Sequence, residues 1–229
     1  MIEKTRAIVL RSVKYGDAQL IVDVFTEKFG RMAFDVRISK SPKSRMKRQY
    51  FQPMMILDMQ FDHRTKSKLQ KLKDVAISIP FGDIPFSAFK LSISMFLAEF
   101  LCYSIRNEST HVALFQFLVN SMEWLDVAQK GYANFHVVFM IRLSLFLGFS
   151  PNMESGSDGG MFDMEEGRFV ACMPNHKHCL GKEESLRMRQ LVRLTYSTMH
   201  LYAMSHVERN RCISVILEYY RLHIPNFPK

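Results

Sequence analysis

Residues Thr5–Ile38 read TRAIVLRSVKYGDAQLIVDVFTEKFGRMAFDVRI and carry the clearest structural pattern in the chain. β-Branched and apolar residues gather there in three short runs, each of which favours an extended strand. Turn-forming sequences separate the runs at Lys14–Asp17 and Glu27–Gly30. The segment therefore predicts a three-stranded meander, with strands over Thr5–Val13, Leu20–Thr26 and Arg31–Ile38.

Two more strands are predicted downstream of this meander. Pro53–Phe61 (PMMILDMQF) is a fourth candidate, and Lys68–Ile79, whose first half is basic, is a fifth. No convincing amphipathic helix lies among the five segments. Because an open sheet would leave its edge strands exposed, five short strands in about 80 residues favour a small closed barrel of the OB type.

The pattern changes after Ile79–Pro85, a segment whose prolines interrupt regular structure. Ser87 is the expected N-cap of a first helix, and apolar residues then recur with a period near 3.6. Gly148 and Pro151 are expected to end the third helix, and residues from there to about 181 lack periodicity. The apolar faces of the first three helices are Leu91, Phe96, Leu97, Phe100 and Leu101; Val112, Phe115, Leu118, Val119 and Trp124; and Phe135, Phe139, Leu143, Phe146 and Leu147. Two further helices are expected over Glu183–Ser205 and Arg209–His223.

The predicted fold class is therefore α+β with two domains. Residues 1–80 form a five-stranded OB-type β-barrel that binds nucleic acid. Residues 81–229 form an all-α helical bundle with an irregular, zinc-finger-like insertion at about 150–181. No apolar run approaches the roughly 18 residues that a membrane span needs. The four cysteines are few for 229 residues, so a reducing cytoplasm is the expected location.

Positive charge is concentrated at the N-terminal end of the chain. Residues 1–73 hold 17 Lys and Arg against 7 Asp and Glu, whereas residues 74–229 hold 14 against 15. This asymmetry predicts a polyanion-binding module joined to a nearly neutral one. The candidate DNA-binding residues are Arg6, Arg11, Arg31, Arg37, Lys40, Lys43, Arg45, Lys47, Arg48, Arg64, Lys66 and Lys68.

Two basic stretches stand out within this module. Ser39–Arg48 has five cations and no acid, and it is expected to be a loop that reaches phosphates without reading sequence; a solvated linker is the plainer alternative. Arg64–Lys73 would place a cationic stripe on one face of a strand if it is extended. Aromatic side chains could stack on bases or could simply fill the barrel. They are Tyr15, Phe29, Phe34, Tyr50 and Phe51.

The insertion contains a cluster of soft and imidazole side chains within eight residues. Cys172, His176, His178 and Cys179 are weak metal candidates, because a structural zinc site usually draws a second ligand pair from elsewhere. We expect a surface loop and no cofactor. The chain has no glycine-rich phosphate loop, no paired-histidine helix motif and no Gly-x-Ser-x-Gly elbow, so the sequence does not predict an enzyme.

The chain also resembles a known family. Arg6–Leu10, Tyr15–Asp17, Phe25–Gly30 and Gln52–Pro53 are similar to the opening strands of the RecO family of bacterial recombination mediators. Arg142–Pro151, Phe162–Asp163, Glu166–Gly167 and Tyr219–His223 resemble the hallmarks of its helical domain.

This resemblance implies a role in DNA repair and recombination after DNA damage, as in the SOS response. It implies a cytoplasmic, nucleoid-associated protein that binds single- and double-stranded DNA, promotes strand annealing, and helps load a recombinase. The implied partners are the ring protein RecR and the acidic C-terminal tail of the single-strand binding protein. Candidate residues for that tail are Arg142, Arg187, Arg189 and Arg193. Many family members carry a four-cysteine zinc site in the insertion, whereas the first cysteine pair is missing here.

Two readings from other functional classes remain open on the sequence alone. The first is an RNA- or ribosome-associated adaptor that binds protein partners and lacks annealing activity. The second is a hydrolase or nuclease with a metal bound by the cysteines and histidines of the insertion. Acceleration of DNA annealing would distinguish the mediator from the adaptor, and stoichiometric zinc would support the metal enzyme.

Overall fold

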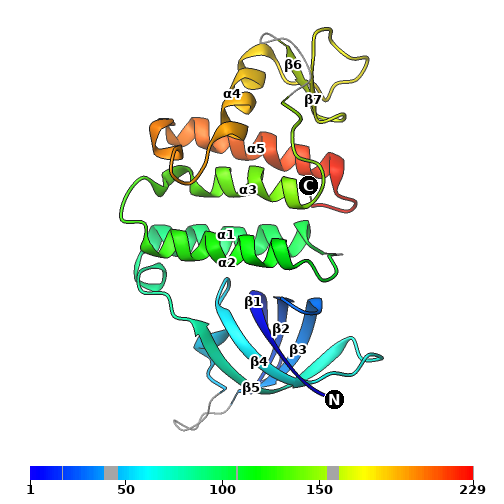
Figure 1. Ribbon diagram of the computed structural model, residues 1–229, viewed down its shortest axis with the longest axis vertical. Helices are drawn as coiled ribbons and strands as arrows, with labels where there is room; N and C mark the ends of the chain where they lie inside the picture. Colours follow the sequence, from blue (N-terminus) through cyan, green and yellow to red (C-terminus); the bar gives the residue numbers. More distant parts are fainter. Residues whose placement is uncertain (17, 39–45, 107, 154–159, 229) are drawn as a thin grey trace. The chain divides into compact units, whose positions relative to one another are not determined.

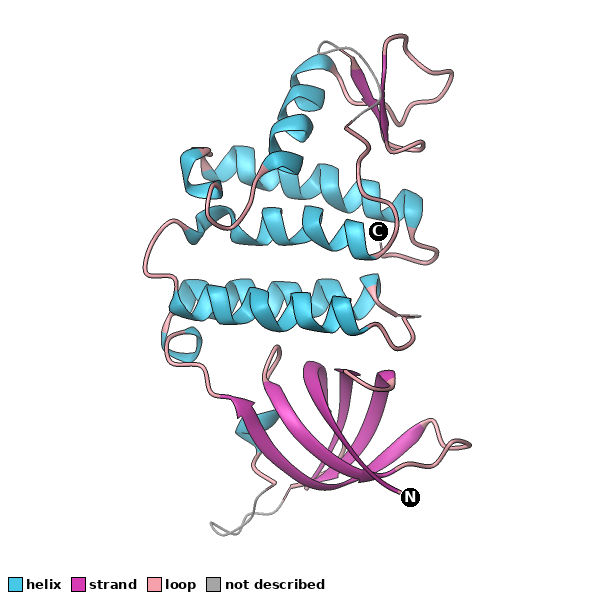
Figure 2. Ribbon diagram, viewed as in Figure 1, coloured by secondary structure: helices cyan, strands magenta, loops and turns pink. Residues whose placement is uncertain are grey.

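The computed structural model describes residues 1–16, 18–38, 46–106, 108–153 and 160–228. The chain divides into two compact units, Met1–Val127 and Ala128–Lys229. The first unit holds a β-barrel and two helices, and the second holds three helices and a small two-stranded hairpin (Figures 1 and 2).

Five strands form the closed barrel of the first unit, as the sequence predicts. The order is β1-β2-β3-β5-β4, in which only the β3–β5 pair is parallel. Side chains that alternate along the strands, among them Val22, Val24, Phe34 and Phe61, point inward and are buried. The strands are β1 (Ile2–Lys14), β2 (Gln19–Thr26), β3 (Gly30–Arg37), β4 (Ile56–Asp62) and β5 (Leu69–Ile79).

A short 3₁₀ helix, η1 (Arg48–Phe51), precedes β4 and was not expected from the sequence. It carries Phe51 into the barrel core, where the ring is 1% exposed. The first unit also contains η2 (Ile84–Phe86), α1 (Ala88–Ser104) and α2 (Val112–Val127). Ser87 caps α1 as predicted, because its hydroxyl accepts a hydrogen bond from the backbone N–H of Lys90 at 3.4 Å.

Charged side chains hold the segment between barrel and α1 against the end of α2. The Asp126 carboxylate accepts hydrogen bonds from the backbone N–H groups of Gly82, Asp83 and Ile84 at 2.8–2.9 Å. Lys90 is 1% exposed, and its Nζ lies 2.6 Å from Asp83 Oδ2 and donates to the Asp126 carbonyl at 2.8 Å. These contacts hold α1, α2 and the linker together, and the compact unit that contains the barrel extends through α2 to Val127.

The second unit contains η3 (Tyr132–Asn134), α3 (Phe135–Phe146), α4 (Lys182–Arg193), η4 (Met199–Leu201) and α5 (His206–His223). The expectation that a helix runs from Glu183 to Ser205 is wrong. The helix stops at Arg193, because the hydroxyls of Thr195 and Thr198 bond the backbone of each other's residue and form a turn.

The last helix begins three residues earlier than the predicted Arg209. Ser205 and Glu208 form a capping box, in which each side chain bonds the backbone N–H of the other residue. The insertion, expected to be irregular, contains the hairpin β6 (Met161–Asp163) and β7 (Arg168–Val170). No helix among the described residues is both long enough and apolar enough to cross a membrane.

Candidate nucleic-acid interface

A groove of about 1180 Å³, here called the barrel groove, runs along the outer surface of the barrel. Its lining residues come from β1, β2, β3 and β5, from the β1–β2 and β4–β5 loops and the β2–β3 turn, and from the α1–α2 loop. In OB folds the face of strands 2 and 3 and the loops flanking it are where oligonucleotides bind. Its lining includes Arg11, Tyr15, Asp23, Lys28, Phe29, Arg31, His63, Arg64, Lys68, Arg106 and Thr110.

The charge of the barrel groove is positive. Asp23 is the one carboxylate among its described lining residues, and Arg31 forms an ion pair with it through two hydrogen bonds. Burial alone would lower the pKa of Arg31, but the hydrogen bond and the charge of Asp23 raise it above its ordinary value. The guanidinium thus stays charged and neutralises the acid. The other described cations of the groove are Arg11, Lys28, Arg64, Lys68 and Arg106.

The predicted DNA-binding residues are only partly gathered in this groove. Four of them line it: Arg11, Arg31, Arg64 and Lys68. Lys66 lies in the same β4–β5 loop, whereas Arg37, Lys47 and Arg48 are exposed at positions that do not line the groove. Lys40, Lys43 and Arg45 lie outside the described residues.

Arg6 is engaged within the first unit. Its guanidinium forms two hydrogen bonds with the Glu27 carboxylate, at 2.7 and 3.1 Å, and lies 5.4 Å from the ring centroid of Phe115. The hydrogen bond to Glu27 raises the pKa of Arg6, and the same bond lowers the pKa of Glu27. A phosphate would have to compete with this carboxylate for Arg6.

The second basic stretch does not form the extended cationic stripe that the sequence suggested. Residues 63–68 form the loop between β4 and β5. The side chain of Gln70, 3% exposed, closes this loop by bonding the backbone N–H and carbonyl of Arg64 and the carbonyl of Ser67, at 2.7–2.9 Å. Arg64 and Lys68 are therefore brought to the groove by a turn and not by strand alternation.

The aromatic candidates divide between core and groove. Phe34 and Phe51 are buried in the barrel, and Tyr50 packs against the core cluster. Tyr15 is 67% exposed and lines the groove together with the half-buried Phe29.

Three groove residues were missed by the sequence reasoning. Lys28 belongs to the β2–β3 turn, His63 follows β4, and Arg106 follows α1. Lys28 and His63 lie at the ends of predicted strands, and this position in the sequence could have identified them as candidate binding residues. No local pattern marks Arg106, because its position depends on how the α1–α2 loop packs on the barrel.

The insertion of the second unit places its histidines beside carboxylates. The buried Asp163 carboxylate accepts hydrogen bonds from the backbone N–H groups of Glu165 and Glu166, and its Oδ2 lies 3.2 Å from His176 Nε2. His178 Nδ1 lies 3.4 Å from Glu218 Oε1.

These residues do not fit the four-thiolate zinc site that the resemblance implies. The insertion supplies two cysteines, Cys172 and Cys179, where such a site needs four thiolates, and Cys172 is exposed. Within the described part of the chain, no group of three or more His, Cys, Asp or Glu side chains is placed to hold a metal ion.

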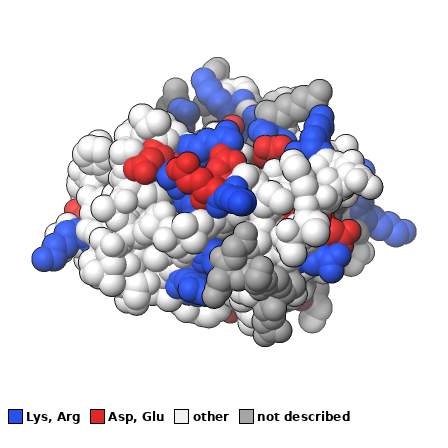
Figure 3. Space-filling view, turned by 90° about the horizontal axis from the view of Figure 1, so that it is seen from above, with Lys and Arg blue, Asp and Glu red and all other residues white. Residues whose placement is uncertain are grey.

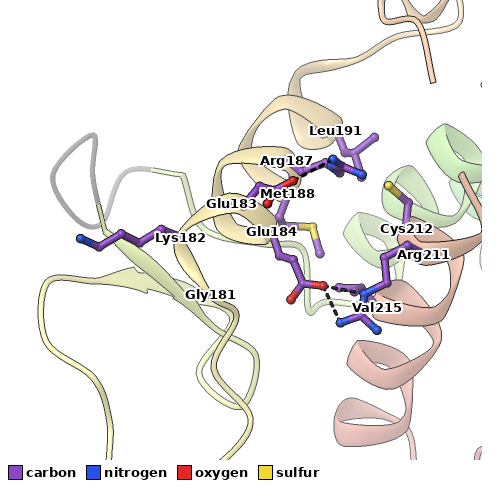
Figure 4. Close-up of a pocket in the computed structure, with 10 residues that line it drawn as sticks. All are labelled: Gly181, Lys182, Glu183, Glu184, Arg187, Met188, Leu191, Arg211, Cys212 and Val215. Atoms are coloured by element: carbon purple, nitrogen blue, oxygen red, sulfur yellow. Dashed lines mark hydrogen bonds and ion pairs between the residues drawn. The ribbon is translucent and has the colours of Figure 1, made fainter. Parts of the chain in front are cut away.

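A second cavity, here called the helical pocket, lies between α4 and α5 and has a volume of about 420 Å³. Met188, Leu191, Cys212 and Val215 supply its apolar lining (Figure 4). Ion pairs stand at its rim, where Arg187 pairs with Glu183 at 3.3 Å and Arg211 with Glu184 at 2.6 Å (Figure 4). Basic and acidic side chains also lie next to one another on the face shown in Figure 3.

Of the four arginines predicted to bind a partner's tail, Arg187 alone is a lining residue of the helical pocket. Arg189 is buried, with its guanidinium 4.1 Å from the ring centroid of Phe169. Arg142 donates to the Leu194 carbonyl at 3.3 Å, and Arg193 is exposed in the last turn of α4. The structure therefore does not gather the four into one site.

A closed five-stranded barrel with a cationic groove, followed in sequence by helices, defines the chain as an OB-type barrel protein with a helical C-terminal domain. Sequence models of one family cover it: Recombination protein O N terminal matches residues 1–81, and Recombination protein O C terminal matches residues 85–229. The chain belongs to the RecO family of DNA repair proteins, which is not a known enzyme family.

Individual relatives agree with this assignment. The protein named DNA repair protein RecO of Phocaeicola vulgatus is 42% identical over 228 residues, and that of Bacteroides fragilis is 42% identical over 229 residues. The protein of the same name from Porphyromonas gingivalis is 31% identical over 232 residues. Each match covers 100% of this chain and 95% of the relative.

Proposed function

We propose that this protein is a DNA-binding recombination mediator that holds single- and double-stranded DNA in the barrel groove and promotes annealing of complementary strands. The observation that carries the proposal is the composition of the groove, where five described cations line the surface in addition to Arg31, which neutralises the one described carboxylate, Asp23. Lys and Arg contacts to phosphates bind without reading sequence, as an annealing protein requires.

Annealing needs no bond to be made or broken by the protein. Two DNA strands repel each other through their phosphates, and cations in the groove screen this repulsion while bases find their partners. Base pairing then supplies the free energy. The protein would work without catalysis, with no cofactor and no zinc, in the cytoplasm and in association with the nucleoid.

The same proposal extends to the loading of a recombinase onto DNA coated with single-strand binding protein, with RecR as a further partner. The helical pocket supports an interaction with the tail of the single-strand binding protein, which ends in an apolar residue after acidic ones. Its lining could receive the apolar side chain. The ion pairs at its rim are partly exposed, so Arg187 and Arg211 could exchange a glutamate for an acidic peptide at little cost.

An annealing assay tests the proposal. Complementary DNA oligonucleotides labelled with a donor and an acceptor dye are mixed with the full chain, with and without single-strand binding protein. We expect faster pairing that weakens as salt rises. Unchanged pairing rates, together with tight RNA binding, would replace this proposal with that of an RNA- or ribosome-associated adaptor.

The pocket is tested separately with a peptide that copies the acidic tail. Fluorescence anisotropy should show binding that Arg187→Ala weakens and that Lys130→Ala, an exposed cation that does not line the helical pocket, leaves unchanged. If the Arg187→Ala and Lys130→Ala variants bind the peptide with equal affinity, the tail does not bind in the helical pocket.

A further inference from the structure

Hydrogen bonds join the α1–α2 loop to the β2–β3 turn and the start of β3, beside the barrel groove. The Thr110 hydroxyl donates to the Lys28 carbonyl at 2.9 Å, and the Arg31 backbone N–H donates to the Glu108 carbonyl at 3.4 Å. Gly30 permits this approach, since a Cβ atom there would lie 2.6 Å from the carbonyl carbon of Ser109. Glu108 and Thr110 of this loop are therefore held against the barrel, and Arg106 of the same loop lines the groove.

Two aromatic rings form a supported surface on the groove. The Phe29 ring meets the fully buried Phe61 edge-on, with centroids 5.6 Å apart and planes at 81°. The His63 ring lies 4.8 Å from Phe29, and its backbone N–H donates to the Met1 carbonyl at 2.9 Å. Phe29 and His63 are both half-buried lining residues of the groove. Contacts with the core thus limit the movement of rings that a ligand can still reach.

We propose that the barrel groove is built for an unpaired strand, with a base stacked on the Phe29–His63 pair, another on Tyr15, and the adjoining phosphates held by Arg106 and Lys28. This inference rests on the proposed function and names the form of DNA that the groove prefers. Stacking on protein aromatics needs the face of a base, and a duplex already covers both faces of each base with its neighbours.

In this arrangement the reactant strands make contacts that the annealed product does not make. Rings and cations together hold the unpaired strands, whereas after pairing only the cations contact the product. The groove therefore binds the reactant strands more tightly than the duplex, which favours release of the product. Arg106, from the loop between α1 and α2, adds a phosphate contact that is the same for unpaired and paired strands.

Fluorescence anisotropy of the full chain with probes of equal length tests the inference. The probes are an oligothymidylate and an abasic oligonucleotide, which has the same phosphates but no bases. We expect the base-bearing strand to bind about fivefold or more tightly than the abasic one. His63→Ala and Tyr15→Ala should each reduce this ratio, and His200→Ala, an exposed histidine of the second unit, should leave it unchanged.

Arg106→Ala should act on the phosphate contacts alone. It should weaken both probes by the same factor and lower the salt dependence of binding by about 0.7 in the slope of log K against log salt. Lys71→Ala removes one charge from β5 outside the groove and serves as the matched control. Melting temperatures within a few degrees of the parent protein would establish that each variant is folded.

The experiment distinguishes failure of the stacking surface from failure of DNA binding itself. Equal affinity of the parent protein for the base-bearing and abasic probes, or a ratio unchanged by both His63→Ala and Tyr15→Ala, overturns the stacking surface and leaves DNA binding in place. A protein that binds neither probe overturns the proposed function as well.

Discussion

The salt dependence of DNA binding should reveal which cations contact phosphates. The triple variant Lys28→Ala, Arg64→Ala and Lys68→Ala removes three exposed cations that line the barrel groove. Each phosphate neutralised on a single strand contributes about 0.7 to the slope of log K against log salt, so the slope should fall by about 2. If parent and variant bind equally at about 1 M salt, this difference corresponds to roughly 50-fold weaker binding at about 0.15 M.

Fluorescence anisotropy titrations at a series of salt concentrations measure both slopes. The matched control is the triple variant Lys4→Ala, Lys71→Ala and Lys73→Ala, which removes the same charge from exposed positions on β1 and β5 that do not line the groove. Its slope should stay close to that of the parent. Equal losses in both triple variants would mean that DNA responds to net charge and not to the groove, which would refute the reasoning.

Three further predictions concern stability. Asp126→Ala removes three hydrogen bonds from a carboxylate to backbone N–H groups and should cost about 2–4 kcal/mol in urea unfolding. Burial raises the pKa of Asp126, but those N–H groups and the charge of Lys90 more than offset it, so the pKa lies below its usual value. This stabilisation is present at neutral pH and is lost as the pH falls below about 4. The difference in free energy of unfolding between the parent and Asp126→Ala should therefore shrink at low pH. A difference that stays constant with pH would contradict this explanation. Gly30→Ala should destabilise by more than about 1–2 kcal/mol, because the position has φ +68° and no room beside Ser109; an unchanged melting temperature would show that the α1–α2 loop moves freely. A chelator should leave the melting temperature of the second unit's helices unchanged, and a drop of several degrees together with stoichiometric zinc would overturn the zinc-free proposal.

The barrel was predictable because its signals are local. Alternating apolar residues and turn sequences between Thr5 and Ile38 mark three strands without reference to any distant residue. The first three helices were predictable for the same reason, since their period and the cap at Ser87 are properties of short segments.

The errors arose where side chains compete with the regular pattern. The apolar period continues past Arg193, but hydroxyl groups at Thr195 and Thr198 bond the backbone and end α4. The Ser205–Glu208 capping box is readable from sequence, and weighing it would have moved the start of α5 to its observed place.

The positive charge of the barrel groove was predictable from the sequence, but the residues that line it were not. Charge counting places the excess cations in the first 73 residues, yet it cannot tell that Arg6 is engaged by Glu27. Arg106 lies at the groove because the loop that contains it is held there by the hydrogen bond from Thr110 to the Lys28 carbonyl, and these two residues are 82 positions apart in the sequence. Such a contact has no signature in a single sequence.

Photo-crosslinking tests most directly whether the barrel groove is where DNA binds. A single-stranded oligonucleotide containing 5-iodouracil is irradiated with the full chain, and the crosslinked peptides are identified by mass spectrometry. The account predicts crosslinks at Tyr15, Phe29 or His63. Crosslinks confined to peptides of α4, α5 or the outer surface of β5 would contradict it.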